Sequence, residues 1–327
     1  MQDPWKEVDP VTALPGELGI VDQIGNTPLL RLPGVGVPSQ VSVYAKLEFF
    51  NPGGSVKDRP ARRMILEGIA SGALGPGKVI LDSTSGNTGI AYAMIGAALG
   101  YPVKLAMPAN VTRERSSILA AYGAQVVLTD PAEGSDGAIL EARRIQAEDA
   151  ERYFKPDQYN NPANWWAHRD STAREIWRQT GGDVTHLVAT MGTSGTVMGT
   201  GRGLKARNPE ITVIGVEPSD AFHGIEGLKH MDSSIVPGIY DESFLDSKIG
   251  VDTDDAYEAA LRLSRELGVL VGQSSGAAYE AALGVARELS RGTVVTIFCD
   301  GGDKYMTTPM WRELLEERGV SGSASRC

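Results

Sequence analysis

The stretch Asn51-Pro-Gly-Gly-Ser-Val-Lys-Asp-Arg59 lies between a strand-like segment, 41–48, and a helix that we expect at 57–70. Three other loops rich in glycine, serine and threonine are also placed between an expected strand and an expected helix. They are Ser83-Thr-Ser-Gly-Asn-Thr-Gly89, Met191-Gly-Thr-Ser-Gly-Thr196 and Gly272-Gln-Ser-Ser-Gly276. In open α/β sheets such loops lie at the carboxyl ends of the strands, where ligands bind. Together they predict a ligand site built from distant parts of the chain.

Short apolar runs alternate with helical stretches along the chain, which predicts an open α/β fold with helices on both faces of the sheet. Most of the runs are apolar on both faces, as in strands buried in a parallel sheet. A closed barrel is less favoured, because the spacing is too uneven for eight regular βα units. The stretch 218–250 breaks the rhythm and is predicted to be a long functional loop. The expected strands are 41–48, 78–82, 103–107, 125–129, 186–189, 212–216, 269–272 and 293–298, and the expected helices are 57–70, 88–99, 112–122, 135–150, 165–180, 196–207, 254–267, 275–290 and 309–318.

The composition excludes several classes of protein. The 327 residues include 31 Lys and Arg against 41 Asp and Glu, a net charge of −10, which disfavours general binding to nucleic acid. The two cysteines, Cys299 and Cys327, exclude a disulfide framework and a CxxC metal cluster, so no metal is expected. No run approaches about 18 apolar residues, and the N-terminus lacks the basic and apolar regions of a signal peptide. We therefore expect a cytoplasmic protein without a membrane span.

The loop Gly192–Thr196 is predicted to hold an anion, and because it contains only neutral donors the prediction is a phosphate. Its glycines let backbone N–H groups converge, its hydroxyls add donors, and the following helix contributes its positive end. The alternative is an ordinary capped helix start. Lys57 opens a helix and suits a Schiff-base amine, whereas the alternative is a solvated lysine beside Asp58 and Arg59.

The other two loops also have two interpretations each. The hydroxyls and amide of 83–89 can bracket a carboxylate, or they can cap a helix. The pattern Gly272-x-Ser274-x-Gly276 matches the nucleophile elbow of serine hydrolases. That fold has its histidine after the serine, but all four histidines of this chain precede Ser274. A hydrolase using Ser274 stays as the alternative outside the main class.

The four loops, together with Gly25-Asn-Thr-Pro-Leu29 and Asn161-Pro-Ala-Asn164, resemble the cysteine synthase family of pyridoxal-phosphate enzymes. The resemblance runs in order from about residue 20 to about 307. It implies a tryptophan-synthase-like fold with two open, mostly parallel, twisted sheets, and a homodimer. It also implies a larger cofactor-binding domain, 1–47 and 157–327, and a smaller, mobile domain, 48–156, that closes over the substrate.

The same resemblance implies roles for individual residues. Lys57 resembles the lysine that binds pyridoxal phosphate covalently, Asn87 the partner of its phenolic oxygen, and Ser274 the partner of its ring nitrogen. The implied phosphate-binding residues are Gly192, Thr193, Ser194, Gly195 and Thr196, and the implied substrate-carboxylate residues are Thr84, Ser85, Gly86, Thr88 and Gln158.

The implied reaction is β-elimination from an activated L-serine, O-acetyl-L-serine or O-phospho-L-serine, followed by addition of sulfide to give L-cysteine. The segment 227–240 resembles the B-type enzymes, some of which use phosphoserine, and Lys229 resembles a phosphate-reading position. Asp157-Gln-Tyr159 and Ser171-Thr-Ala173 look closer to cystathionine β-synthases, which join serine to homocysteine. That reaction is the alternative within the class, and a catalytically silent scaffold is disfavoured because Lys57 is present.

Overall fold

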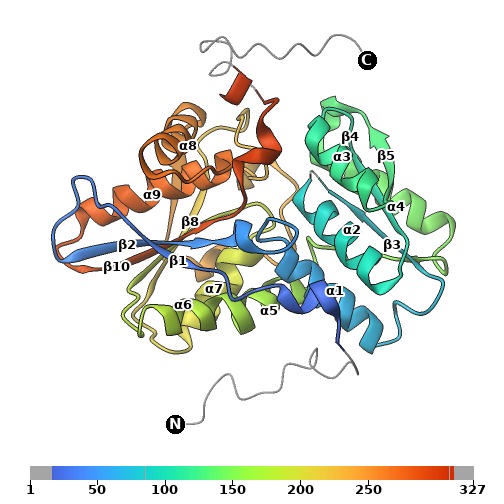
Figure 1. Ribbon diagram of the computed structural model, residues 1–327, viewed down its shortest axis with the longest axis horizontal. Helices are drawn as coiled ribbons and strands as arrows, with labels where there is room; N and C mark the ends of the chain where they lie inside the picture. The colour runs from blue at the N-terminus through green and yellow to red at the C-terminus, as the bar shows by residue number, and fades with distance from the viewer. Residues whose placement is uncertain (1–16, 85, 309, 313–327) are drawn as a thin grey trace.

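The computed structural model describes residues 17–84, 86–308 and 310–312, and its strands form two separate sheets (Figure 1). Within these residues the larger sheet has the order β1-β2-β10-β7-β8-β9, with β1 antiparallel to β2 and the other pairs parallel. The smaller sheet, β5-β4-β3-β6, is parallel throughout. Two open, mostly parallel sheets are as predicted. The strands are β1 Leu29–Leu32, β2 Val41–Leu47, β3 Val79–Ser83, β4 Val103–Pro108, β5 Gln125–Thr129, β6 Tyr153–Phe154, β7 His186–Thr190, β8 Thr212–Pro218, β9 Ser247–Val251 and β10 Gly292–Phe298.

Helices cover both faces of each sheet, which confirms the predicted layering (Figure 1). The alternation of side chains along β10 shows how: Val294 and Phe298 pack with α8 and α9, whereas Val295 and Ile297 pack with α6 and α7. On the smaller sheet, α1, α2 and α3 share one core with β3 and β4, and α4 packs on the other face. The helices are α1 Asp58–Ala70, α2 Asn87–Leu99, α3 Arg113–Ala121, α4 Gly134–Glu148, α5 Ala163–Ala167, α6 Ala173–Gln179, α7 Gly195–Lys205, α8 Thr253–Leu267 and α9 Gln273–Glu288.

Some sequence predictions of local structure are wrong. The segment 269–272 forms no strand, and only Val271 makes an isolated bridge, to Gly301. The long loop expected at 218–250 contains most of β9, which pairs with β8 but has a half-exposed, lysine- and glycine-containing sequence that hides its strand character. The helix expected at 165–180 is interrupted by a π-helical turn, His168–Thr172. Of the helix expected at 309–318, residues 309 and 313–318 lie outside the described residues.

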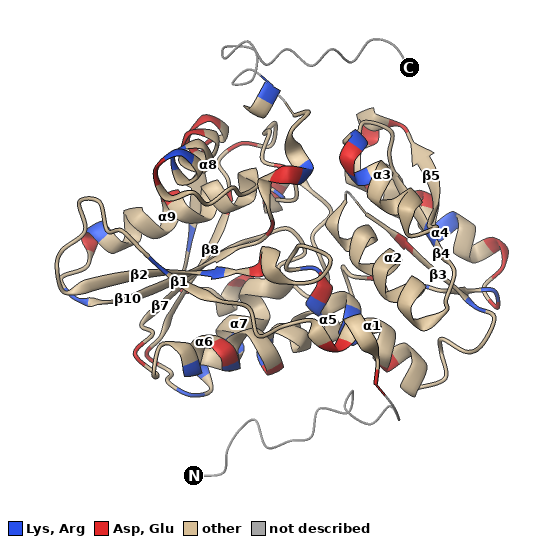
Figure 2. Cartoon of the chain, in the orientation of Figure 1, with Lys and Arg blue, Asp and Glu red and all other residues tan. Residues whose placement is uncertain are grey.

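Charged residues of both signs are interspersed along the helices, as α4 and α8 show in Figure 2. Among the described residues, no helix has the length and apolar character needed to cross a membrane. The described side chains also include no group of three or more His, Cys, Asp or Glu arranged to hold a metal ion. The smaller sheet is built from 79–154, inside the range predicted for the mobile domain, and that domain division stays a prediction.

Candidate active site

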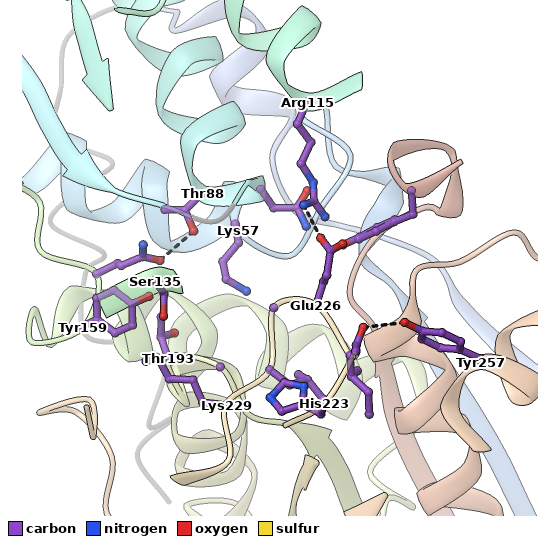
Figure 3. Close-up of a pocket in the computed structure, with 18 residues that line it drawn as sticks. Lys57, Thr88, Arg115, Ser135, Tyr159, Thr193, His223, Glu226, Lys229 and Tyr257 are labelled. Atoms are coloured by element: carbon purple, nitrogen blue, oxygen red, sulfur yellow. Dashed lines mark hydrogen bonds and ion pairs between the residues drawn. The ribbon is translucent and has the colours of Figure 1, made fainter. Parts of the chain in front are cut away.

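Loops from both sheets surround a cavity of about 370 Å³ (Figure 3). A smaller cavity of about 40 Å³ shares several of its lining residues, including Lys57 and Asn87. The two cavities bring together most of the residues that the sequence singles out. Those lining the larger one are Lys57, Asn87, Thr88, Gln158, Gly192, Thr193 and Lys229, and the smaller one adds Ser194, Thr196 and Ser274.

Lys57 is the residue immediately before α1, and its side chain points into the cavity between Thr88 and Thr193 (Figure 3). The preceding loop is held by its own side chains. Asn51 donates from Nδ2 to the Ser55 carbonyl at 3.1 Å, and the N–H of Lys57 donates to Ser55 Oγ at 3.2 Å. The asparagine and serine of the quoted motif therefore place the lysine amine at the cavity.

The loop before α7 has the properties of an anion site. Ser194 has a left-handed backbone, with φ 65°, and its buried Oγ has no hydrogen-bond partner among the described residues. The backbone N–H groups of Gly192, Thr193 and Ser194 likewise donate to no acceptor in the described chain. Free donors at the start of an eleven-residue helix match the oxygens of a phosphate.

Glycine is required at two positions of this loop. A Cβ on Gly192 would collide with the Gly227 carbonyl, and a Cβ on Gly195 would collide with the Asn164 side chain. Asn164 in turn donates from Nδ2 to Thr193 Oγ1 at 3.1 Å. The loop is therefore packed from behind while its donors stay open, and pyridoxal phosphate fits the donor set through its phosphate.

The loop 84–88 reaches the cavity only in part. Thr84 Oγ1 accepts from the N–H groups of Gly86 and Gly89, at 3.0 and 3.1 Å, and neither Thr84 nor Gly86 lines the cavities. Ser85 lies outside the described residues. Thr88 donates to Gln158 Oε1 at 2.8 Å, so these two side chains form one wall of the cavity.

Two ion pairs connect helices of the smaller sheet to the loop 223–229. Lys229 Nζ lies 3.3 Å from Asp136 Oδ1 of α4, and Arg115 Nη1 of α3 lies 2.6 Å from Glu226 Oε2. The sequence analysis missed Arg115 and Glu226, because no local pattern marks a pair 111 residues apart. It also missed Asp300, although this residue follows the carboxyl end of a buried strand and its position could have identified it.

A buried ion network holds α1 against the larger sheet. Arg59 Nε lies 2.6 Å from Glu48 Oε2, Arg59 Nη1 lies 2.7 Å from Glu175 Oε1, and Lys46 Nζ lies 2.7 Å from Glu175 Oε2. Burial alone would raise the pKa of Glu175, but the hydrogen bonds and charge of Arg59 outweigh it and hold that pKa at about 2. The network anchors the helix that begins next to Lys57.

The buried carboxyl group of Asp58 should make the stability of the protein depend on pH. Burial raises its pKa from 3.8 to about 7, against the opposing hydrogen bond from Gly53. A carboxyl group whose pKa is higher in the folded than in the unfolded protein adds to the free energy of unfolding at low pH. This contribution is complete below the pKa of the unfolded state, near 4, and is lost as the pH rises through the folded-state pKa, near 7. We expect Asp58→Asn to lose this decline between pH 4 and 7 in the free energy of unfolding, measured by urea titration. Asp255→Asn, at an exposed position on α8, is the control and should keep the wild-type slope, whereas equal slopes in all three proteins would contradict the assignment.

Comparisons with known proteins agree on one family. A family model described as "Pyridoxal-phosphate dependent enzyme" matches residues 20–300. The chain is 56% identical to a cysteine synthase of Aquifex aeolicus (strain VF5) over 301 residues, covering 90% of this chain and 92% of that protein. It is 42% identical to cysteine synthase B of Pseudomonas aeruginosa over 292 residues, covering 89% and 97%.

A solved structure supports the same assignment. The crystal structure of cysteine synthase from Entamoeba histolytica superimposes with a TM-score of 0.85 at 37% identity, covering 95% of this chain and 93% of that one. The matched region contains the lysine, the anion loop and both sheets. The chain therefore belongs to the cysteine synthase family of pyridoxal-phosphate-dependent enzymes, which act by β-substitution.

Proposed function

We propose that the chain makes L-cysteine from sulfide and an activated L-serine, O-acetyl-L-serine or O-phospho-L-serine. The observation that supports this most is the pairing of the Lys57 amine with an open anion loop in one cavity. The cysteine synthases among the relatives support the same reaction. A serine hydrolase finds no support, because no histidine is among the described residues that line the smaller cavity with Ser274.

The residues of the cavity suit pyridoxal phosphate. Lys57 would hold its aldehyde carbon, the loop 192–196 its phosphate, Asn87 its phenolic oxygen and Ser274 its ring nitrogen. When bound, the cofactor withdraws electrons from the substrate Cα, which makes the Cα–H bond acidic and lets the β-substituent leave.

The chain's own residues then move one proton and orient the substrate. Lys57 Nζ would take the substrate Cα proton as a general base. The substrate carboxylate would be held by the loop 84–88 and Gln158, of which Thr88 and Gln158 line the cavity. The hydroxyl of Ser274 is neutral, so it would bond to the ring nitrogen without a negative charge to hold a proton there, which would favour elimination over transamination.

We also propose that the segment 48–156 closes over the substrate as a smaller domain. The pairs Arg115–Glu226 and Lys229–Asp136 support this, because each joins a helix of the smaller sheet to the loop at the cavity. Closure would exclude water, which would otherwise hydrolyse the reactive product of elimination. The expected homodimer and the expected cytoplasmic location stay predictions.

A direct assay tests the function. The purified enzyme, loaded with pyridoxal phosphate, should form cysteine from sulfide with O-acetylserine, O-phosphoserine or both. Serine with homocysteine should yield little product. Cystathionine as the main product would instead favour the alternative activity within the class.

From the position of Lys229 we expect a preference between the two activated serines. Its buried Nζ lies at the cavity with Asp136 as its ion-pair partner, so an anionic leaving group would compete with Asp136 for it. We expect Lys229→Ala to lower kcat/KM for O-phosphoserine by about tenfold or more, the loss of one charge-assisted contact, and to change the O-acetylserine value little. The phosphoserine rate of the wild type should also fall as salt increases.

A matched control separates charge at the site from charge in general. Lys248 pairs with Glu217 and Glu242 and lines neither cavity. Lys248→Ala should therefore leave kcat/KM unchanged for both O-phosphoserine and O-acetylserine. Equal losses on both donors in Lys229→Ala would mean that Lys229 only supports the loop.

A further inference from the structure

The side-chain amide of Asn87 is held from two sides. Its Nδ2 donates to Asp300 Oδ2 at 2.5 Å, and its Oδ1 accepts from Lys304 Nζ at 3.2 Å. A carboxylate only accepts and an ammonium only donates, so these partners allow one orientation of the amide. Of the two Nδ2 hydrogens, Asp300 takes one and the other remains for a further acceptor.

Lys304 is a buried lysine, 4% exposed, and all three of its donors have acceptors. Besides Asn87, its Nζ donates to the carbonyls of Gly53 and Gly54, at 2.9 and 3.0 Å. These two glycines belong to the loop that leads to Lys57. The ammonium group therefore joins Asn87 to the segment that carries the reactive amine.

Asp300 is fully buried and lines the smaller cavity, together with Ser274. Its Oδ2 accepts from the Tyr305 hydroxyl as well as from Asn87. Its Oδ1 has no hydrogen-bond partner among the described residues. Burying a carboxylate costs free energy unless hydrogen bonds compensate for the lost water. Both side-chain hydrogen bonds of Asp300 fall on Oδ2, the atom that accepts from Asn87.

We propose that Asp300 and Lys304 are positioning residues, which fix the Asn87 amide with its second Nδ2 hydrogen toward the phenolic oxygen of bound pyridoxal phosphate. This inference rests on the role proposed above for Asn87. Removing one partner leaves the amide held from one side only, so that it can swing out of this direction, and removing both lets it rotate by half a turn and present its oxygen instead. An oxygen in that place would repel an ionised phenolic oxygen rather than stabilise it.

The absorbance spectrum of the holoenzyme tests this orientation. A hydrogen bond donated to the phenolic oxygen stabilises its ionised form, which absorbs in the visible range, over the neutral form, which absorbs in the near ultraviolet. We expect Lys304→Met to lower the ratio of visible to near-ultraviolet absorbance and to raise the Kd for pyridoxal phosphate about tenfold, the loss of one aligned hydrogen bond. Lys304→Arg keeps a charged donor and should retain most of the wild-type ratio.

A second buried lysine serves as the control. Lys46 is fully buried and donates to the Thr27 carbonyl and to Gln179, and it lines neither cavity. Lys46→Met should lower Tm but leave the absorbance ratio unchanged. If Lys304→Met does not fold, Asp300→Asn is the second variant, and it should give the same fall in the ratio.

A double-mutant cycle shows whether Lys304 acts through Asn87. Asn87→Ala should lower the absorbance ratio, and Lys304→Met should lower it no further in that background. A shift in Asn87→Ala with no shift in Lys304→Met, or two shifts that add fully, would overturn the positioning role and leave the proposed function standing. An unchanged spectrum in Asn87→Ala would overturn the role of Asn87 and this inference with it.

Discussion

Lys57→Ala is expected to abolish covalent cofactor binding and to lower the rate of cysteine formation by at least about 10²–10⁴-fold, the contribution of general base catalysis alone. Lys57 differs from the other cations of the larger cavity. Arg115 is paired with Glu226 and Lys229 with Asp136, whereas the described residues include no ion-pair partner for Lys57 Nζ. Its amine is therefore the one available to react.

Borohydride reduction measures this directly. In the wild type, reduction should remove the visible band and leave a stable adduct on the peptide that contains Lys57, identified by mass spectrometry. Lys229→Ala should give the same adduct and is the control. An unchanged reducible band in Lys57→Ala would refute the assignment. A colourless wild type inactivated by a serine-directed fluorophosphonate would instead indicate the hydrolase.

Arg59→Met is expected to lower the free energy of unfolding by about 3–5 kcal/mol, because removing one member of a buried ion network leaves its partners unpaired. Arg59 donates to both Glu48 and Glu175, and Glu48 is fully buried. Lys46 still contacts Glu175 in the variant, but Glu48 loses its ion pair with Arg59. The loss is a large part of the about 5–15 kcal/mol that holds a typical domain together.

Urea denaturation of the holoenzyme measures this difference. The control is Arg62→Met on the same helix, since Arg62 is partly exposed and lies 3.9 Å from its partner, Asp22. That variant should stay within about 0.5 kcal/mol of the wild type. Similar losses in both variants would mean that α1 tolerates the unpaired carboxylates and that the network contributes little.

The fold, and the gathering of the singled-out loops around one pair of cavities, were predictable because their signals are local. A loop such as Gly192–Thr196 carries its glycines, hydroxyls and helix start within a few residues, so an anion site can be proposed there without knowing its neighbours. The apolar sequences of β10 and β8 likewise lie within a few consecutive residues, so they predict buried strands without knowledge of the rest of the fold. The shift to a π-helical turn at 168–172 has no such signal, because tertiary packing decides it.

The contacts that orient the site were not predictable, although the place of Asp300 just after β10 marks it as a candidate site residue. Lys304 looks like a surface lysine in sequence, but it is buried, and its amine contacts the carbonyls of Gly53 and Gly54, which are 251 and 250 residues away along the chain. Asp300 and Asn87 are 213 residues apart. These contacts depend on how the two sheets pack against each other. The periodicity and spacing of residues in a single sequence do not reveal that packing.

The position of β10 has a consequence for synthesis on the ribosome. This strand, Gly292–Phe298, lies between β2 and β7, so the larger sheet stays split in its middle until residue 298 has been made. The smaller sheet is complete once Phe154 has emerged. Until β10 arrives, the facing edges of β2 and β7 expose unpaired backbone groups, which is the condition under which nascent strands aggregate. The facing edges of β2 and β7 are therefore left unpaired for longer during synthesis than the inner edges of the smaller sheet.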